Sequence, residues 1–119
     1  MMAALMVSDG ICASRIAYPS LRRMRAPWTR MIGLIGKRRI DPRRAYLFDH
    51  CPSVHTCFMS VPIDVIICDR DMRVLRVETM RPWRMLSERP RKARAVIEAA
   101  AGSAAELGIK PGCALSIKP

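Results

Sequence analysis

The most informative stretch of this sequence is residues 51–66, Cys-Pro-Ser-Val-His-Thr-Cys-Phe-Met-Ser-Val-Pro-Ile-Asp-Val-Ile. It places His55, Thr56 and Asp64 in or beside an apolar run of the kind that forms buried strands. A polar group taken out of water costs free energy unless it finds a partner. We therefore expect a buried strand over residues 63–68, with its polar neighbours either hydrogen-bonded or lining a site.

The residues that follow this stretch predict a β-hairpin. Residues 69–72 have the composition of a turn, and residues 73–78 suit the returning strand. Pro62 cannot donate a hydrogen bond to a sheet, so it marks an edge or a bulge. Further strands are expected over residues 11–18, 45–48, 54–59 and 114–117.

Two short helices are expected. The first runs over residues 27–37, because proline suits the first helical position and apolar residues follow at helical spacing. The second runs over residues 103–107, where Ser103 and Glu106 have the spacing of a capping box. Gly108 is expected to end it. Residues 93–101 suit either a helix or a strand, since good helix formers there surround Ala-Val-Ile.

The length and composition favour one small domain. The chain has 119 residues, half of them hydrophobic, which is enough to build a core. We expect a basic, weakly structured segment over residues 1–26 and a single β-rich domain over residues 27–119. No run of residues approaches the length of a membrane span, and the apolar start lacks the charge pattern of a secretory signal.

The chain is strongly basic. Its net charge is +11, with +7 in residues 1–50 and +4 in the remainder. A basic surface attracts phosphate, acidic proteins or anionic lipids. The residues expected to form this basic surface are Arg38, Arg39, Arg43 and Arg44. The sequence has no recognised nucleic-acid motif and few aromatic residues for stacking on bases, so any such binding is expected to be salt-sensitive and nonspecific.

The five cysteines do not form the dense framework of a secreted domain. Reduced cysteines in a cytoplasmic protein fit this pattern, although a Cys51–Cys57 disulfide remains open. His50, Cys51, His55 and Cys57 are potential zinc ligands, but their irregular spacing does not match a standard tetrahedral site. We therefore expect neither a metal nor another cofactor.

Five segments, met in order between residues 28 and 117, resemble one known family. They are Arg30-Met-Ile-Gly-Leu-Ile-Gly-Lys37, then Val54-His-Thr-Cys-Phe-Met59 with Pro62-Ile-Asp-Val65, then Pro82-Trp83, then Val96-Ile-Glu98 with Gly102, and finally Gly108-Ile109 with Gly112. Together they are similar to domain-of-unknown-function family 192, small bacterial and archaeal proteins without an assigned biochemical function.

The resemblance implies a compact, mainly β domain, and it favours a strand over residues 93–99. We follow it, because tertiary context often overrides helix propensity. Gly108 and Gly112 are then structural turn residues. Two positions depart from the family pattern: Cys113 replaces an aspartate of the closing turn, and Met72 replaces a glycine of the hairpin turn. The expected fold is α+β and β-dominated, a small barrel-like sheet of antiparallel or mixed strands with two short helices.

The chemistry of the central stretch leaves several roles open. If a ligand site exists, His55, Thr56 and Asp64 are expected to line it, with no catalytic residue assigned. Asp64 could equally be a structural anchor that accepts hydrogen bonds from an arginine or from loop N–H groups. Cys57 beside His55 could form a nucleophile and base, but two residues on one strand are too far apart for good contact.

The sequence predicts a small soluble module, cytoplasmic, that binds an unknown small ligand or protein partner, and it favours such a module over an enzyme. One alternative is an enzyme or metal protein that uses the region of His55, Cys57 and Asp64. The other is binding of nucleic acid or an acidic partner through the basic N-terminal half.

Overall fold

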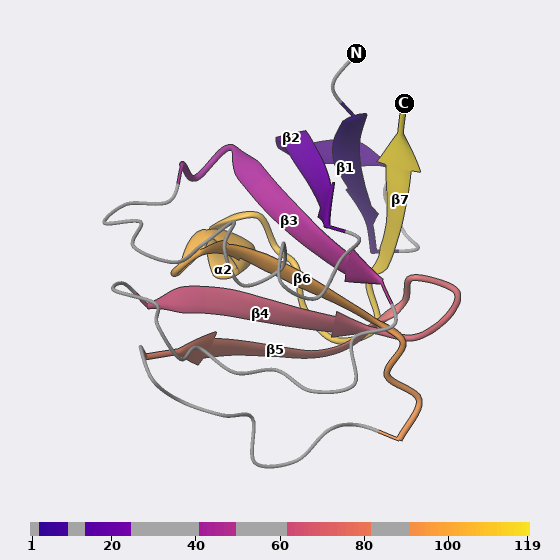
Figure 1. Cartoon of the computed structure of the whole chain (residues 1–119). Helices are drawn as coiled ribbons and strands as arrows, with labels where there is room; N and C mark the ends of the chain where they lie inside the picture. Colours follow the sequence, from indigo (N-terminus) through magenta and orange to yellow (C-terminus); the bar gives the residue numbers. More distant parts are fainter. Residues whose placement is uncertain (1–2, 10–13, 25–40, 50–61, 82–90) are drawn as a thin grey trace.

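The computed structural model describes residues 3–9, 14–24, 41–49, 62–81 and 91–119. Within these ranges the chain forms seven strands and one short helix (Figure 1). They are, in chain order, β1 (Ala3–Ser8), β2 (Arg15–Met24), β3 (Arg44–Asp49), β4 (Ile63–Cys68), β5 (Val74–Met80), β6 (Ala95–Ala100), α2 (Ser103–Glu106) and β7 (Ala114–Lys118).

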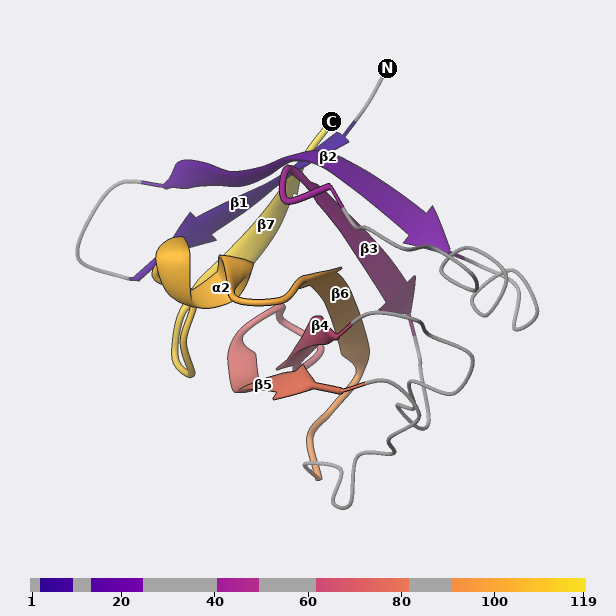
Figure 2. The same ribbon diagram turned by 90° about the vertical axis from the view of Figure 1, so that its left-hand side faces the viewer.

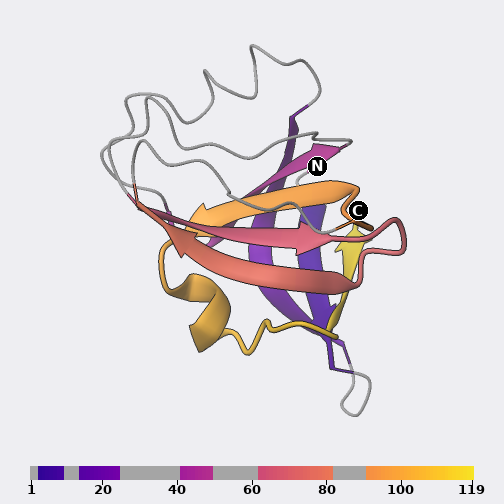
Figure 3. The ribbon, with the colours of Figure 1, turned by 90° about the horizontal axis from the view of Figure 1, so that it is seen from below.

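The seven strands form one sheet in the order β5-β4-β6-β3-β2-β1-β7. Strands β2 and β3 pair in parallel, and every other pair is antiparallel. Figure 3 shows β5, β4 and β6 side by side in this order. The prediction of a β-dominated, mixed sheet is therefore confirmed.

The predicted barrel is not confirmed, because the two edge strands meet only where each begins. There, Arg73 and Ala114 form an isolated bridge, and the Val74 N–H donates to the carbonyl of Cys113 at 2.8 Å. From this shared corner β5 and β7 leave in different directions (Figure 1). The sheet is thus open along most of both edges, since two diverging strands cannot sustain a hydrogen-bonded ladder.

The buried side chains form two clusters, one on each face of the sheet. Strand β4 contributes to both, because alternate residues of a strand point to opposite faces and all six of its residues are buried. The first cluster includes Leu5, Tyr18, Leu47, Ile66 and Ile97. The second includes Phe48, Ile63, Val65, Ile67 and Val96.

Helix α2 belongs to the first face. Its Ala104 is fully buried in the first cluster, and Figure 2 shows the helix between the β1–β2 half of the sheet and the β4–β5 half. The expected helix over residues 103–107 is confirmed at Ser103–Glu106. The other expected helix, over residues 27–37, lies outside the described residues, as does the strand expected over residues 54–59.

The N-terminal segment differs from expectation. Residues 1–26 were predicted to be weakly structured, yet residues 3–8 and 15–24 form β1 and β2. Strand β1 pairs with β7, and β2 pairs with β3. The prediction was wrong for these residues because their order comes from pairing with strands distant in the sequence, which local periodicity does not reveal.

The ambiguous segment before α2 is a strand. Residues 95–100 form β6, which pairs with β4 on one side and β3 on the other. Its helix-forming alanines are overridden because Ile97 and Ala99 are fully buried between these neighbours. The hairpin of β4 and β5 is confirmed as well, although its turn places Met72 at φ +62, a conformation that favours glycine.

Gly108 and Gly112 both have positive φ, +72° and +96°. We expect Gly108→Ala to lower the free energy of unfolding by about 2–3 kcal/mol and Gly112→Ala by about 1–2 kcal/mol. A Cβ at residue 108 would lie 2.9 Å from the Arg15 guanidinium, whereas none of the neighbouring atoms lies within 4 Å at residue 112. Relieving that contact would break the 2.7 Å bond from Arg15 to the Leu107 carbonyl. Urea unfolding of both variants measures the difference, and equal losses would contradict this role for Arg15.

Candidate functional site

Asp64 lies at the centre of a buried hydrogen-bonded node. Its side chain is on β4, on the face that α2 covers, and the residue is 1% exposed. One carboxylate oxygen accepts from the Thr79 hydroxyl at 2.6 Å and from the Gly102 N–H at 3.0 Å. The other accepts from the Ala104 N–H at 3.0 Å. A buried carboxylate with three donors matches the structural-anchor interpretation.

These contacts show how α2 begins. The first N–H groups of any helix lack partners within the helix. Here Asp64, about 40 residues away in the sequence, accepts from those of Gly102 and Ala104. The predicted capping box was wrong, because Gly102 is the N-cap residue and no side-chain cap bond forms within the segment.

The Ser103 hydroxyl forms hydrogen bonds outside the helix. It donates to the carbonyl of Ala100 at 2.6 Å and lies 2.8 Å from the hydroxyl of Tyr18. Because the single hydroxyl proton of Ser103 is used on Ala100, Tyr18 is the donor of the second bond. Burial raises the pKa of Tyr18 to about 12, with a further contribution from the charge of Asp64, so the phenol keeps the proton that it donates.

Of the three predicted ligand-lining residues, the structure describes Asp64. His55 and Thr56 lie outside the described residues, as do Cys57 and the other potential metal ligands of residues 50–57. Among the described residues, no three His, Cys, Asp or Glu side chains cluster as a metal site would require. Cys68 and Cys113 are buried free thiols. Burial, with the charge of Asp69, raises the pKa of Cys68 to about 12, which disfavours a reactive thiolate.

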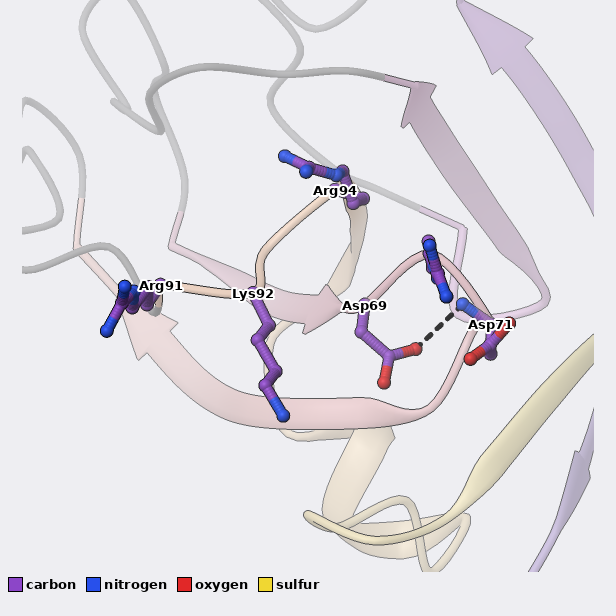
Figure 4. Close-up of a pocket in the computed structure, with 6 residues that line it drawn as sticks. Asp69, Asp71, Arg91, Lys92 and Arg94 are labelled. Atoms are coloured by element: carbon purple, nitrogen blue, oxygen red, sulfur yellow. Dashed lines mark hydrogen bonds between the residues drawn. The ribbon is translucent and has the colours of Figure 1, made fainter.

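A second site lies at the end of the sheet where the β4–β5 hairpin turn meets the segment entering β6 (Figure 4). It is a cleft of about 580 Å³. We call it the basic cleft. The residues that line it are Asp69, Arg70, Asp71, Arg91, Lys92 and Arg94. All six are charged, and the four cations exceed the two carboxylates.

The two sides of the basic cleft are held in place by backbone hydrogen bonds. The Arg94 N–H donates to the carbonyl of Cys68 at 2.8 Å, which ties the segment before β6 to the hairpin. The hairpin turn is closed by Asp69, whose carboxylate accepts from the N–H groups of Asp71 at 2.9 Å and Arg73 at 3.0 Å. An aspartate that caps its own turn in this way stiffens it.

Sequence reasoning missed the basic cleft, because it weighted the charge of the N-terminal half. The missed signal is Arg91-Lys92 and Arg94 directly before a strand that pairs with the strand ending at Cys68. Of the predicted basic surface, Arg38 and Arg39 lie outside the described residues. Arg43 is exposed, its N–H donating to the Asp41 carboxylate at 2.9 Å, and Arg44 begins β3.

Glu98 is a titratable group on the second face of the sheet. It lies on β6 between Tyr46 of β3 and Val65 of β4. Burial raises the pKa of Glu98 from its ordinary value of 4.5 to about 7. The folded protein therefore binds a proton more tightly there than the unfolded chain does.

The free energy of unfolding is expected to fall as the pH rises from 4.5 to about 7. Between pH 4.5 and about 7 the unfolded chain has lost the Glu98 proton that the folded protein retains. Glu98→Gln should remove this dependence and raise the free energy of unfolding above pH 7 by about 1–3 kcal/mol. Urea unfolding at acidic and alkaline pH measures it, with the exposed Glu106→Gln as control. An unchanged pH dependence in Glu98→Gln would contradict this assignment.

Residues 14–117 match the sequence family DUF192, which carries the description "Uncharacterized ACR". The chain belongs to the DUF192 family. The resemblance drawn from the five sequence segments is confirmed, and the match begins within the segment that leads into β2. No curated protein matches the chain.

Two solved structures share the fold of this DUF192 domain. One is described as a putative transcription regulator from Sinorhizobium meliloti 1021, with a TM-score of 0.81 and 20% identity over 98% of this chain and 93% of that chain. The other is a protein of unknown function from Novosphingobium aromaticivorans DSM 12444, with a TM-score of 0.79 and 22% identity over 95% of this chain and 83% of that chain. Similarity at these identities establishes the fold alone. In the part of this chain that the structure describes, no helix is long and apolar enough to cross a membrane.

Proposed function

We propose that this DUF192 domain is a binding module that holds an anionic ligand in the basic cleft. One observation carries the proposal: across the described ranges, the side chains of its four cations have no hydrogen bond or ion pair. These cations are Arg70, Arg91, Lys92 and Arg94. Arg15, by contrast, donates to the Leu107 carbonyl at 2.7 Å.

Unpaired cations around a cleft favour an anion for two reasons. Guanidinium groups present forked donors that match carboxylate and phosphate oxygens, and an ammonium adds a compact charge. Several like charges around a concave surface also reinforce one another's field, which raises the local concentration of an anion. Neither effect needs a conformational change here, since backbone bonds already hold the two sides together.

The cytoplasm is the proposed location. Cys68 and Cys113 are free and buried, which suits a reducing compartment.

A ligand site lined by His55, Thr56 and Asp64 stays a separate prediction, as does the enzyme or metal protein using His55, Cys57 and Asp64. The three donors already bound to Asp64 favour the basic cleft over both.

The alternative function is binding of nucleic acid or an acidic protein through the N-terminal half. It is favoured by exposed arginines at the β2–β3 pair, Arg22 and Arg43. The description of the S. meliloti structure as a putative transcription regulator is compatible with it. The arginines predicted for that basic surface also include Arg44, which begins β3, and Arg38 and Arg39, which lie outside the described residues. Binding of this kind would weaken steeply with salt and would depend on Arg22 and Arg43 instead of the cleft.

The double variant Arg91→Gln, Lys92→Gln should bind anions more weakly, while the double variant Arg22→Gln, Arg43→Gln should keep the native affinity. The probes are inorganic phosphate, citrate and a short single-stranded oligonucleotide, each titrated calorimetrically at low salt. We expect the cleft variant to bind roughly 10-fold more weakly, because two charge-assisted contacts are removed. If the N-terminal variant loses affinity instead, the alternative function holds. If none of the probes binds the native protein, the proposal is wrong.

A further inference from the structure

The charges of the basic cleft restrict the kind of anion that it can accept, and this inference rests on the proposed function. Its four cations and two carboxylates sum to +2. A phosphate monoester carries about −1.5 to −2 at neutral pH and presents three strong acceptor oxygens. One such group would balance the lining, whereas a single carboxylate would leave a surplus of positive charge.

The lining also argues against an extended polyanion. None of the six residues is aromatic or apolar, so a nucleobase would find no surface to stack on. Asp69 and Asp71 lie on the hairpin side, opposite Arg91 and Lys92 (Figure 4). A nucleic-acid strand following the cations across the cleft would bring further phosphates against these two carboxylates, which is repulsive.

The two carboxylates of the basic cleft can accept hydrogen bonds from a small ligand that carries hydroxyl groups. One oxygen of Asp69 is bound to the N–H groups of the turn, which leaves its second oxygen with capacity to accept. Asp71 is exposed, and only its N–H is bound within the turn. Carboxylate oxygens accept hydrogen bonds from hydroxyl groups. A cleft of about 580 Å³ is in the range that holds small molecules.

We propose that the basic cleft binds a small phosphorylated polyol, with the phosphate on the cations of the segment before β6 and hydroxyl groups donating to Asp69 and Asp71. The phosphate supplies the charge match and the hydroxyls supply selectivity. Inorganic phosphate would then bind more weakly than a polyol phosphate, and an unphosphorylated polyol would bind weakly or not at all.

The test is calorimetric titration of the full chain with glycerol 3-phosphate, inorganic phosphate, acetate, glycerol and a short oligonucleotide. Glycerol 3-phosphate should bind about fivefold more tightly than inorganic phosphate, the effect of one added hydrogen bond. Asp71→Ala should remove that advantage without weakening inorganic phosphate, because alanine offers no acceptor to a hydroxyl group. The Arg91→Gln, Lys92→Gln variant should weaken both. All substituted residues are exposed, so each variant is expected to fold, which circular dichroism checks.

The outcomes separate this inference from the proposed function. Equal affinity for glycerol 3-phosphate and inorganic phosphate overturns the polyol and leaves an anion site. Tighter binding of acetate or the oligonucleotide, still lost in the Arg91→Gln, Lys92→Gln variant, overturns the phosphate ester and again leaves the anion site. Absence of binding by every anion overturns both. An Asp71→Ala variant that keeps the full advantage of glycerol 3-phosphate overturns the assigned role of the hairpin carboxylates.

Discussion

Asp64→Ala is expected to lower the free energy of unfolding by about 3–5 kcal/mol. The substitution removes the acceptor for the Thr79 hydroxyl and for the N–H groups of Gly102 and Ala104. The Ala104 bond is buried, and its N–H would have no replacement partner from water without local opening. The beginning of α2 and its attachment to β4 would both be weakened.

Urea unfolding followed by circular dichroism measures this loss, with Asp71→Ala as the matched control on an exposed aspartate. Asp64→Asn should fall between the native protein and Asp64→Ala. Its amide oxygen can still accept from Thr79 and Gly102, but its NH2 group would face the Ala104 N–H, donor against donor. If Asp64→Ala unfolds within about 1 kcal/mol of the native protein, the structural anchor is contradicted and a ligand role for Asp64 gains support.

Ile97→Ala is expected to cost about 3–5 kcal/mol. Ile97 is fully buried on β6, near the middle of the sheet, where it pairs with Ile66 of β4 and Leu47 of β3. Truncation removes three carbons from the first core cluster and leaves a cavity. The sheet on both sides is hydrogen-bonded and cannot easily collapse into that space.

The control for this variant is Ile16→Ala. Ile16 is the same residue type in a strand, β2, but it is 50% exposed. Its loss should stay below about 1 kcal/mol, because little apolar area leaves water there on folding. Chemical denaturation of the two variants in parallel gives the comparison. Similar losses would mean that the central position of β6 in the core is wrong.

The strongest local signals in the sequence predicted their elements correctly. The apolar run over residues 63–68 is β4, and the turn over residues 69–72 joins it to β5. These predictions succeed because an entirely buried strand and a short hairpin are encoded by neighbouring residues. The strand over residues 95–100 was different: helix propensity opposed it, and the family resemblance was needed to favour it.

The candidate sites were predicted less well than the strands. Asp64 was singled out because a carboxylate within an apolar run needs partners, but its donors come from β5 and the start of α2. The capping box failed because the helix begins one residue earlier, at Gly102. The Glu106 N–H donates to the Gly102 carbonyl at 3.3 Å, and the Ser103 hydroxyl is bound to the Ala100 carbonyl. The basic cleft was missed because its charges belong to two segments, residues 69–71 and 91–94, that only the sheet brings together.

The sequence by itself determined the β-dominated composition, the buried strand β4, its hairpin with β5, the short helix α2 and the family. Each depends on the order of nearby residues, through periodicity, turn chemistry or motif. Only the tertiary structure decided that β1 and β2 join the sheet, that the sheet stays open, that Asp64 accepts from the start of α2, and that four cations from two segments line one cleft. Those features depend on hydrogen bonds and charges between residues far apart in the chain, whose proximity exists only after folding.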